Sequence, residues 1–261
     1  MARKLGRGHL AAMNESSSPP LTGKTVVVVG GTSGMGLGAV RAALAAGART
    51  VVAGRRALAE RAAIEAPEGQ IRHAVVDVND EASVRGLFDG LGAIDHLLVT
   101  AAPAPGSWGP FLEQDVTAAR RYLDEKLFGS LACARYAAPY LRPGGSITFL
   151  TGVAAIQPHV GMVMVSVTFA ALEALSRALA LELSPLRVNT IRPGFVDSDM
   201  WSFLDEAARE QLRAKVRQGF PARRVGTIED IAHAAVFLMT NPYVTGAVIE
   251  VSGGESLVAV L

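Results

Sequence analysis

A strand-like apolar run that leads into a glycine-rich turn and then a helical segment is the feature that most constrains this 261-residue chain. The run Thr25–Val29 contains four consecutive valines, and glycines follow at positions 30, 31, 34 and 36. Glycines let the backbone turn tightly and come close to a pyrophosphate, whose charge the amide N–H groups of a helix N-terminus stabilise. The turn therefore predicts a dinucleotide site at the start of a sheet.

Apolar β-branched runs alternate with amphipathic segments over the rest of the chain, as expected for a parallel sheet with helices on both faces. The fold class is α/β: a Rossmann-type, doubly wound, parallel sheet of about seven strands. Strands are predicted at 25–29, 50–53, 71–76, 96–100, 146–150, 187–191 and 248–251. Helices are predicted at 36–46, 80–91, 112–140, 162–183 and 227–240, with irregular structure or short helices over 197–222. We expect residues 1–20 to be a flexible extension and 21–261 to be one NADP-binding domain.

Composition excludes several classes of function. The formal net charge of +1 supplies no field for a polyanion, so we expect neither nucleic acid nor a basic membrane contact. Cys133 is the only cysteine and the five histidines are scattered, so we expect no disulfide, no metal site and a reducing, cytoplasmic setting. The uncharged stretch between Arg142 and Glu173 is broken by glycines and a proline, which argues against a membrane span. The first residues lack the apolar core of a secretion signal.

Several motifs together resemble the short-chain dehydrogenase/reductase family in its single-domain branch, from about Leu21 onward. They are the glycine turn, Asp77-Val78 after the third strand, the run from Asn189 to Gly194, and the closing Val251-Ser252-Gly253-Gly254. The resemblance implies cofactor contacts along the carboxyl ends of the strands. The implied residues are Gly30, Thr32, Ser33, Gly34, Met35, Gly36, Asp77, Val78, Thr100, Ala101, Pro193, Gly194, Val196 and Ser198.

The end of the second predicted strand indicates which dinucleotide binds. Arg55 and Arg56 stand where an acidic residue ordinarily holds the ribose hydroxyls of NAD. A guanidinium pairs with a 2′-phosphate through charge-assisted hydrogen bonds, whereas a carboxylate repels it. We therefore predict NADP(H), with Arg55 as the chief ligand and Thr32, Ser33 and Arg56 nearby. The alternative is a solvated arginine pair at a helix start.

The family's catalytic residues are replaced. In the family, a tyrosine, a lysine four residues later, a serine and an asparagine serve proton transfer, and their positions here are Val165, Phe169, Gly152 and Lys126. A shifted register does not restore them, because no tyrosine lies between 140 and 243 and no lysine between 126 and 215.

Two residues near these positions are candidates for the missing chemistry. Lys126 interrupts an apolar helical stripe, so its ammonium could serve as a proton donor of lowered pKa or stabilise a developing alkoxide. The alternative is a surface or structural ion pair with Glu125 or Asp124. Thr151 could donate a hydrogen bond to a carbonyl, or simply favour a strand. Ser166, Thr168 and His159 are further polar candidates, with His159 expected at the surface.

Three classes of function remain open. The first is an NADP(H)-dependent reductase with an atypical proton source, acting on a carbonyl, imine or quinone of a bulky hydrophobic substrate. The second is a non-catalytic NADP(H)-binding partner subunit, and the third is a non-redox cyclase or isomerase. Retention of the cofactor motifs favours the first. Trp108, Met162, Met164, Phe169 and Trp201 suggest an apolar substrate pocket. By resemblance we expect a homodimer or homotetramer, built on small residues: Ala132, Ala134, Ala137, Ala170, Ala174 and Ala178.

Overall fold

The computed structural model describes residues 18–55, 64, 66–101 and 108–258. Arg56 and almost all of the predicted N-terminal extension lie outside these residues.

A seven-stranded, wholly parallel sheet forms the centre of the molecule, with the strand order β3-β2-β1-β4-β5-β6-β7. The predicted fold class and strand positions are confirmed, with boundaries shifted by a few residues. The strands are β1 (Thr25–Val29), β2 (Arg49–Gly54), β3 (Ile71–Val75), β4 (Ile94–Val99), β5 (Leu141–Leu150), β6 (Arg187–Pro193) and β7 (Val248–Val251). The strand order reverses between β1 and β4, where a doubly wound sheet leaves a crevice at its carboxyl edge.

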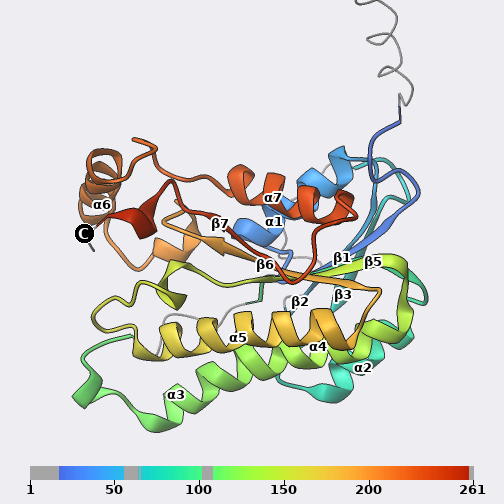
Figure 1. Cartoon of the computed structure of the whole chain (residues 1–261), viewed down its shortest axis with the longest axis horizontal. Helices are drawn as coiled ribbons and strands as arrows, with labels where there is room; N and C mark the ends of the chain where they lie inside the picture. The colour runs from blue at the N-terminus through green and yellow to red at the C-terminus, as the bar shows by residue number, and fades with distance from the viewer. Residues whose placement is uncertain (1–17, 56–63, 65, 102–107, 259–261) are drawn as a thin grey trace, which may run out of the picture.

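Helices cover both faces of this sheet (Figure 1). α1 (Gly34–Ala45) and α7 (Ile228–Thr240) pack together on one face. α2 (Glu81–Asp89), α4 (Gly129–Ala137) and α5 (Val163–Glu182) lie on the other. Alternate valines of β1 point to opposite faces, so Val26 and Val28 join the core under α1 and α7, while Val27 and Val29 join the opposite core.

The predicted helix over 112–140 is interrupted. A short 3₁₀ turn (Phe111–Glu113) precedes α3 (Val116–Leu123), and a π-helical turn (Asp124–Phe128) separates α3 from α4. π turns occur mostly as single insertions within helices, often at functional sites. This one contains Lys126, whose side chain is fully buried.

The prediction of irregular structure or short helices over 197–222 is only partly right. A short 3₁₀ turn (Asp199–Trp201) lies in this range, but α6 (Glu206–Gly219) is a regular helix of 14 residues. The helix buries only Val216 fully, so it lacks the apolar stripe that marks a core helix in a sequence. Charged contacts stabilise it instead. Asp205 caps its N-terminus by accepting from the Ala208 N–H at 2.7 Å, and Arg213 pairs with Asp197 at 2.8 Å.

Among the described residues, α5 alone is long and apolar enough to meet the criteria for a membrane-spanning helix. Its inner face packs on β6 and carries the buried Glu173, whose carboxylate forms a two-pronged ion pair with Arg192 of that strand, at 2.8 and 2.6 Å. The sheet covers only this inner face, and apolar residues such as Val167 and Leu181 remain exposed on the outward face.

Candidate cofactor and substrate site

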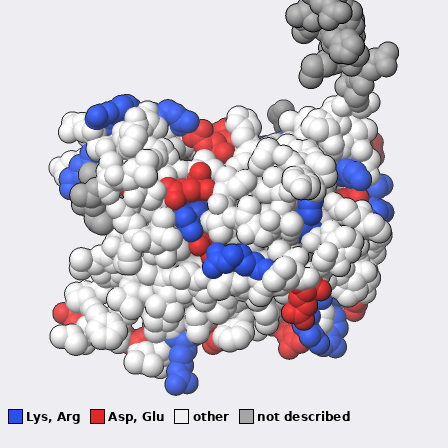
Figure 2. Space-filling model, in the orientation of Figure 1, with Lys and Arg blue, Asp and Glu red and all other residues white. Residues whose placement is uncertain are grey.

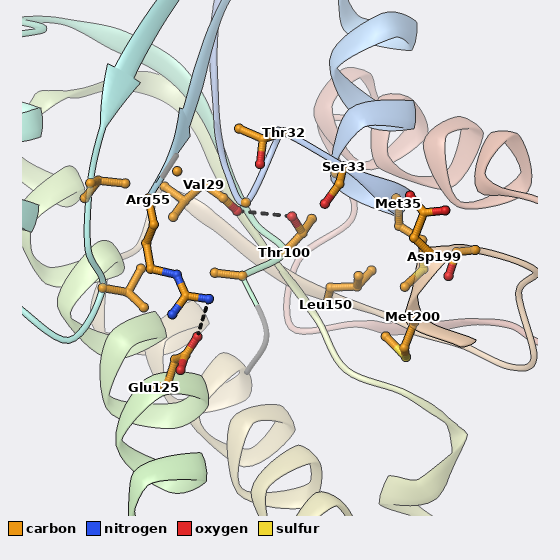
Figure 3. Close-up of a pocket in the computed structure, with 18 of the residues that line it drawn as sticks. Val29, Thr32, Ser33, Met35, Arg55, Thr100, Glu125, Leu150, Asp199 and Met200 are labelled. Atoms are coloured by element: carbon orange, nitrogen blue, oxygen red, sulfur yellow. Dashed lines mark hydrogen bonds and ion pairs between the residues drawn. The ribbon is translucent and has the colours of Figure 1, made fainter. Parts of the chain in front are cut away.

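A cavity of about 410 Å³ opens at the carboxyl edge of the sheet, at the β1–β4 switch point. Its walls come from the ends of β1, β2, β4 and β5, the start of α1, and the segment after β6 (Figure 3). Most of the predicted cofactor residues line it: Gly30, Thr32, Ser33, Gly34, Met35, Gly36, Arg55, Val78, Thr100, Ala101 and Ser198.

The glycine turn approaches β4 so closely that side chains are excluded. A Cβ on Gly30, which has φ +88°, would lie 2.6 Å from the Ala101 nitrogen, and a Cβ on Gly36 would lie 2.2 Å from the Gly30 carbonyl oxygen. Thr100 closes the contact, because its Oγ1 donates to the Val29 carbonyl at 3.1 Å. The first residues of α1 line the cavity. The Ser33 side chain does not cap this helix, so its N-terminal amides are available to an anion.

Arg55 lies in the cavity wall, and its guanidinium points toward Glu125, across from the glycine turn (Figure 3). It faces Glu125 at 3.6 Å, and its side chain is 57% exposed. The Glu125 side chain is only 15% exposed, but the contact is long and the arginine is open to solvent, so the pair is weak and Arg55 can reorient toward a phosphate.

Four predicted cofactor residues, Asp77, Pro193, Gly194 and Val196, do not line the first cavity. Pro193, Gly194 and Val196 line a second cavity, of about 330 Å³, which shares Met35, Ser198 and Met200 with the first. Asp77 lines neither cavity, and its Oδ1 accepts from the Asn79 N–H at 3.0 Å. The two cavities therefore adjoin through the segment after β6.

The second cavity is mostly apolar, as predicted. Trp108, Met162, Val165, Phe169 and Trp201 line it, whereas Met164 packs behind its wall. His159 was expected at the surface; its side chain is 28% exposed but also lines this cavity. Ser166 and Thr168 do not line either cavity.

The residues that the resemblance places at the family's catalytic serine, tyrosine and lysine lie together in this second cavity. The cavity wall at these three positions is apolar, because it consists of Gly152, Val165 and Phe169. The ring of Phe169 covers Gly152, and a Cβ at position 152 would lie 2.8 Å from the Phe169 Cε2. Gly152 and Phe169 are therefore sterically linked, because a side chain at position 152 would overlap the ring.

Lys126 lies behind the cofactor cavity. It is 2% exposed, and its Nζ donates to the Ala101 carbonyl at 2.9 Å. Burial lowers the pKa of Lys126 to about 8, although the nearby Glu125 raises it in part. The alternative of a surface pair with Glu125 or Asp124 is wrong. Because Ala101 lines the cavity and Lys126 does not, its contact with the site runs through this carbonyl.

Thr151 lines the second cavity, but its hydroxyl faces the protein. Oγ1 donates to Glu173 Oε1 at 3.1 Å or to the Ile191 carbonyl at 3.3 Å. A hydroxyl has a single proton, so this arrangement leaves Thr151 as an acceptor toward the cavity.

Three polar residues of the second cavity were not anticipated from the sequence: Tyr122, Gln157 and Glu255. Tyr122 comes from α3, and burial raises the pKa of its phenol above the ordinary value. Gln157 Oε1 and Trp108 Nε1 are buried without a hydrogen-bond partner among the described residues. Only the position of Glu255, directly after the closing glycine pair, could have drawn attention to it.

The described part of the chain contains no group of three or more His, Cys, Asp or Glu residues close enough together to bind a metal ion. Cys133 is fully buried, and burial raises the pKa of its thiol to about 12, as suits a small core residue.

Comparisons with known proteins agree with the fold. Residues 29–256 match the family model described as Enoyl-(Acyl carrier protein) reductase. The short-chain dehydrogenase/reductase ucsE of Acremonium sp is 31% identical over 95% of this chain and 100% of its own length. A small-chain dehydrogenase solved in complex with NADPH is 32% identical, with a TM-score of 0.76 over 90% of this chain and 99% of its own. The MalC reductase/Diels-Alderase of Malbranchea aurantiaca is 27% identical, with a TM-score of 0.81 over 92% and 98%.

The contact between Gly152 and Phe169 predicts a coupled effect on stability. Gly152→Ser should lower the free energy of unfolding by about 1 kcal/mol or more, because the new side chain overlaps the Phe169 ring. In a Phe169→Ala background the same change should cost less, as a double-mutant cycle by urea denaturation would measure. Gly86→Ser, at a site with open space, is the control. Equal costs in both backgrounds would contradict the steric link.

The buried ammonium of Lys126 predicts a pH dependence. Its pKa is about 8 when folded and 10.5 ordinarily, so between these values the unfolded chain holds a proton that the folded chain releases. The free energy of unfolding therefore rises with pH between about 8 and 10.5, because unfolding requires this lysine to take up a proton. Urea denaturation at about pH 7, 8, 9 and 10 should show the wild type gaining stability relative to Lys126→Met, whereas the exposed Lys215→Met should show no such trend. A difference that does not change with pH would refute the burial of a titrating ammonium.

Proposed function

The chain belongs to the short-chain dehydrogenase/reductase family, and we propose that it is an NADP(H)-dependent reductase of a carbonyl, imine or quinone on a bulky hydrophobic substrate. The observation that carries the proposal is the pair of adjoining cavities at the switch point. One is lined by the glycine turn and Arg55, and the other by apolar and aromatic side chains.

NADP(H) fits the first cavity by the chemistry of its wall. The glycine turn and the α1 N-terminus suit the pyrophosphate, and Arg55 beside Thr32 and Ser33 suits the 2′-phosphate. Arg56, predicted to assist, lies outside the described residues. The nicotinamide end would lie toward the shared residues Met35, Ser198 and Met200, next to the second cavity. When bound, the cofactor supplies a hydride.

The residues of this chain contribute mainly by orientation. The apolar second cavity excludes water and holds the substrate beside the cofactor site, and positioning alone supplies a large part of many rate enhancements. Lys126 is a positioning residue, because its ammonium holds the Ala101 carbonyl in the wall of the first cavity. Since a general acid contributes only ~10²–10⁴-fold, its loss is tolerable for an already activated substrate.

Two observations bear on the alternatives. The MalC neighbour is described as a reductase/Diels-Alderase, so cyclisation on this scaffold is the second candidate for a chain without the family's catalytic residues. A purely binding role requires the second cavity to take no substrate, and its unpaired Trp108 and Gln157 atoms favour a ligand there.

We also propose that the chain assembles with copies of itself through α5. The outward face of this helix exposes Val163, Val167 and Leu181, and between them the small residues Ala170, Ala174 and Ala178 allow close approach. Among the other alanines predicted at an interface, Ala134 and Ala137 are instead buried within the domain. A homodimer or homotetramer would cover the apolar face of α5.

Cofactor selectivity tests the proposal through Arg55. Arg55→Ala should raise the Kd for NADPH about tenfold or more and leave the Kd for NADH unchanged, because only NADPH carries the 2′-phosphate. Isothermal titration of each cofactor makes the measurement. Arg49→Ala is the matched control, since this exposed arginine begins the same strand at the opposite edge of the sheet. Equal affinity of the wild type for both cofactors would contradict the assignment.

A further inference from the structure

Among the described residues that line the second cavity, Glu255 is the only carboxylate, and no lysine or arginine accompanies it. Glu255 follows the closing turn, opens the short 3₁₀ helix Glu255–Leu257, and its side chain is only 13% exposed. Its Oε2 accepts from the Phe195 N–H at 2.7 Å. A Cβ on Gly194 would lie 2.5 Å from Oε2, so the glycine makes room for the carboxylate.

No described lysine or arginine lies within 4.0 Å of Glu255. The nearest potential cation is His159, whose Nε2 lies 3.7 Å from Oε1, beyond hydrogen-bond distance. Glu250 adds negative charge nearby, although Arg192 pairs with it at 3.3 Å. Burial and the charge of Glu250 raise the pKa of Glu255, which expresses the cost of a desolvated and weakly paired anion. A cation bound in the cavity would relieve this cost.

Aromatic rings in the same wall also favour a cation. Trp108 and Trp201 have ring centroids 6.1 Å apart, and Phe195 lies 5.1 Å from Trp201. All three line the cavity, and no lysine or arginine does so among the described residues. The faces of aromatic rings attract cations, most strongly once the site excludes water.

We propose that the substrate of this cavity is a cationic iminium, with a C=N⁺ group on an aromatic or other hydrophobic body. The inference rests on the proposed reductase function and names its substrate class. Hydride adds to the iminium carbon, a C–H bond forms, the C=N π pair moves to nitrogen, and the product is a neutral amine. NADPH is oxidised to NADP⁺, and no proton is transferred.

This stoichiometry accounts for the missing proton-transfer residues. Reduction of a neutral ketone generates an alkoxide that must be protonated, and the family's tyrosine and lysine serve that step. An iminium needs no such step, so Val165 and Phe169 at those positions leave the reaction intact. Glu255 would bind the cation before reduction and release the neutral product.

Binding of a cation is testable without turnover. The two tryptophans of the chain, Trp108 and Trp201, both line the cavity, so their fluorescence reports its occupancy. We would titrate benzyltrimethylammonium and its neutral isostere neopentylbenzene, with NADP⁺ present. The cation should bind about tenfold or more tightly than the isostere.

Variants at Glu255 identify the source of the preference. Glu255→Gln keeps the shape and the Phe195 contact but should abolish the preference for the cation. Glu255→Asp retains the charge and should keep part of that preference. This variant distinguishes the loss of the charge from a general folding defect caused by substitution at this position. Glu206→Gln, at an exposed position on α6, should behave as the wild type. Equal binding of the two probes by the wild type, or an unchanged preference in Glu255→Gln, would overturn the proposal.

Turnover separates this inference from the reductase function. NADPH oxidation would be followed with N-methyl-3,4-dihydroisoquinolinium and with the neutral ketone 1-tetralone, each corrected for the reaction without enzyme. Faster reduction of the iminium supports both proposals. Reduction of the ketone in preference overturns the iminium assignment and leaves the reductase function standing. Oxidation of NADPH by neither compound counts against the reductase function and the inference together.

Discussion

The glycine turn after β1 packs against the end of β4 with no space for a side chain between them. Gly30 and Gly36 meet Thr100 and Ala101 at distances that a Cβ would violate. This contact fixes the start of α1 at the switch point of the sheet and so places the helix amides over the first cavity. Lys126 supports the same contact from behind, because its buried ammonium donates to the Ala101 carbonyl. The π turn between α3 and α4 contains this lysine.

One chain of polar groups beside the second cavity is paired within the protein. Thr151 donates toward Glu173, Glu173 pairs with Arg192, and Arg192 reaches Glu250. A buried ion pair that loses one partner leaves an uncompensated charge, so this network constrains β5, α5, β6 and β7 together. It also directs the Thr151 proton away from the cavity. Glu255 differs from these carboxylates in facing the cavity without a described lysine or arginine beside it.

The parts of this structure that sequence predicts are those set by repeated patterns. The strands carry continuous apolar runs, and the glycine turn has a steric requirement that only glycine meets, so both the sheet and most of the cofactor wall could be placed. α6 could not, because ion pairs rather than an apolar stripe stabilise it. The orientation of Arg55 toward Glu125 and the placement of His159 in the cavity wall depend on contacts between distant segments. Glu255 reaches Phe195, sixty residues away along the chain, and no local pattern indicates that approach.

The most direct test of the account follows the hydride itself. Single-turnover reduction of N-methyl-3,4-dihydroisoquinolinium would be measured with NADPH carrying deuterium on one or the other face of C4. The account predicts deuterium at the former iminium carbon from one labelled face only, a slower reaction with that label, and no solvent isotope effect in D₂O. Product without deuterium from either label would contradict direct hydride transfer between the two cavities, and a large solvent isotope effect would contradict reduction without proton transfer.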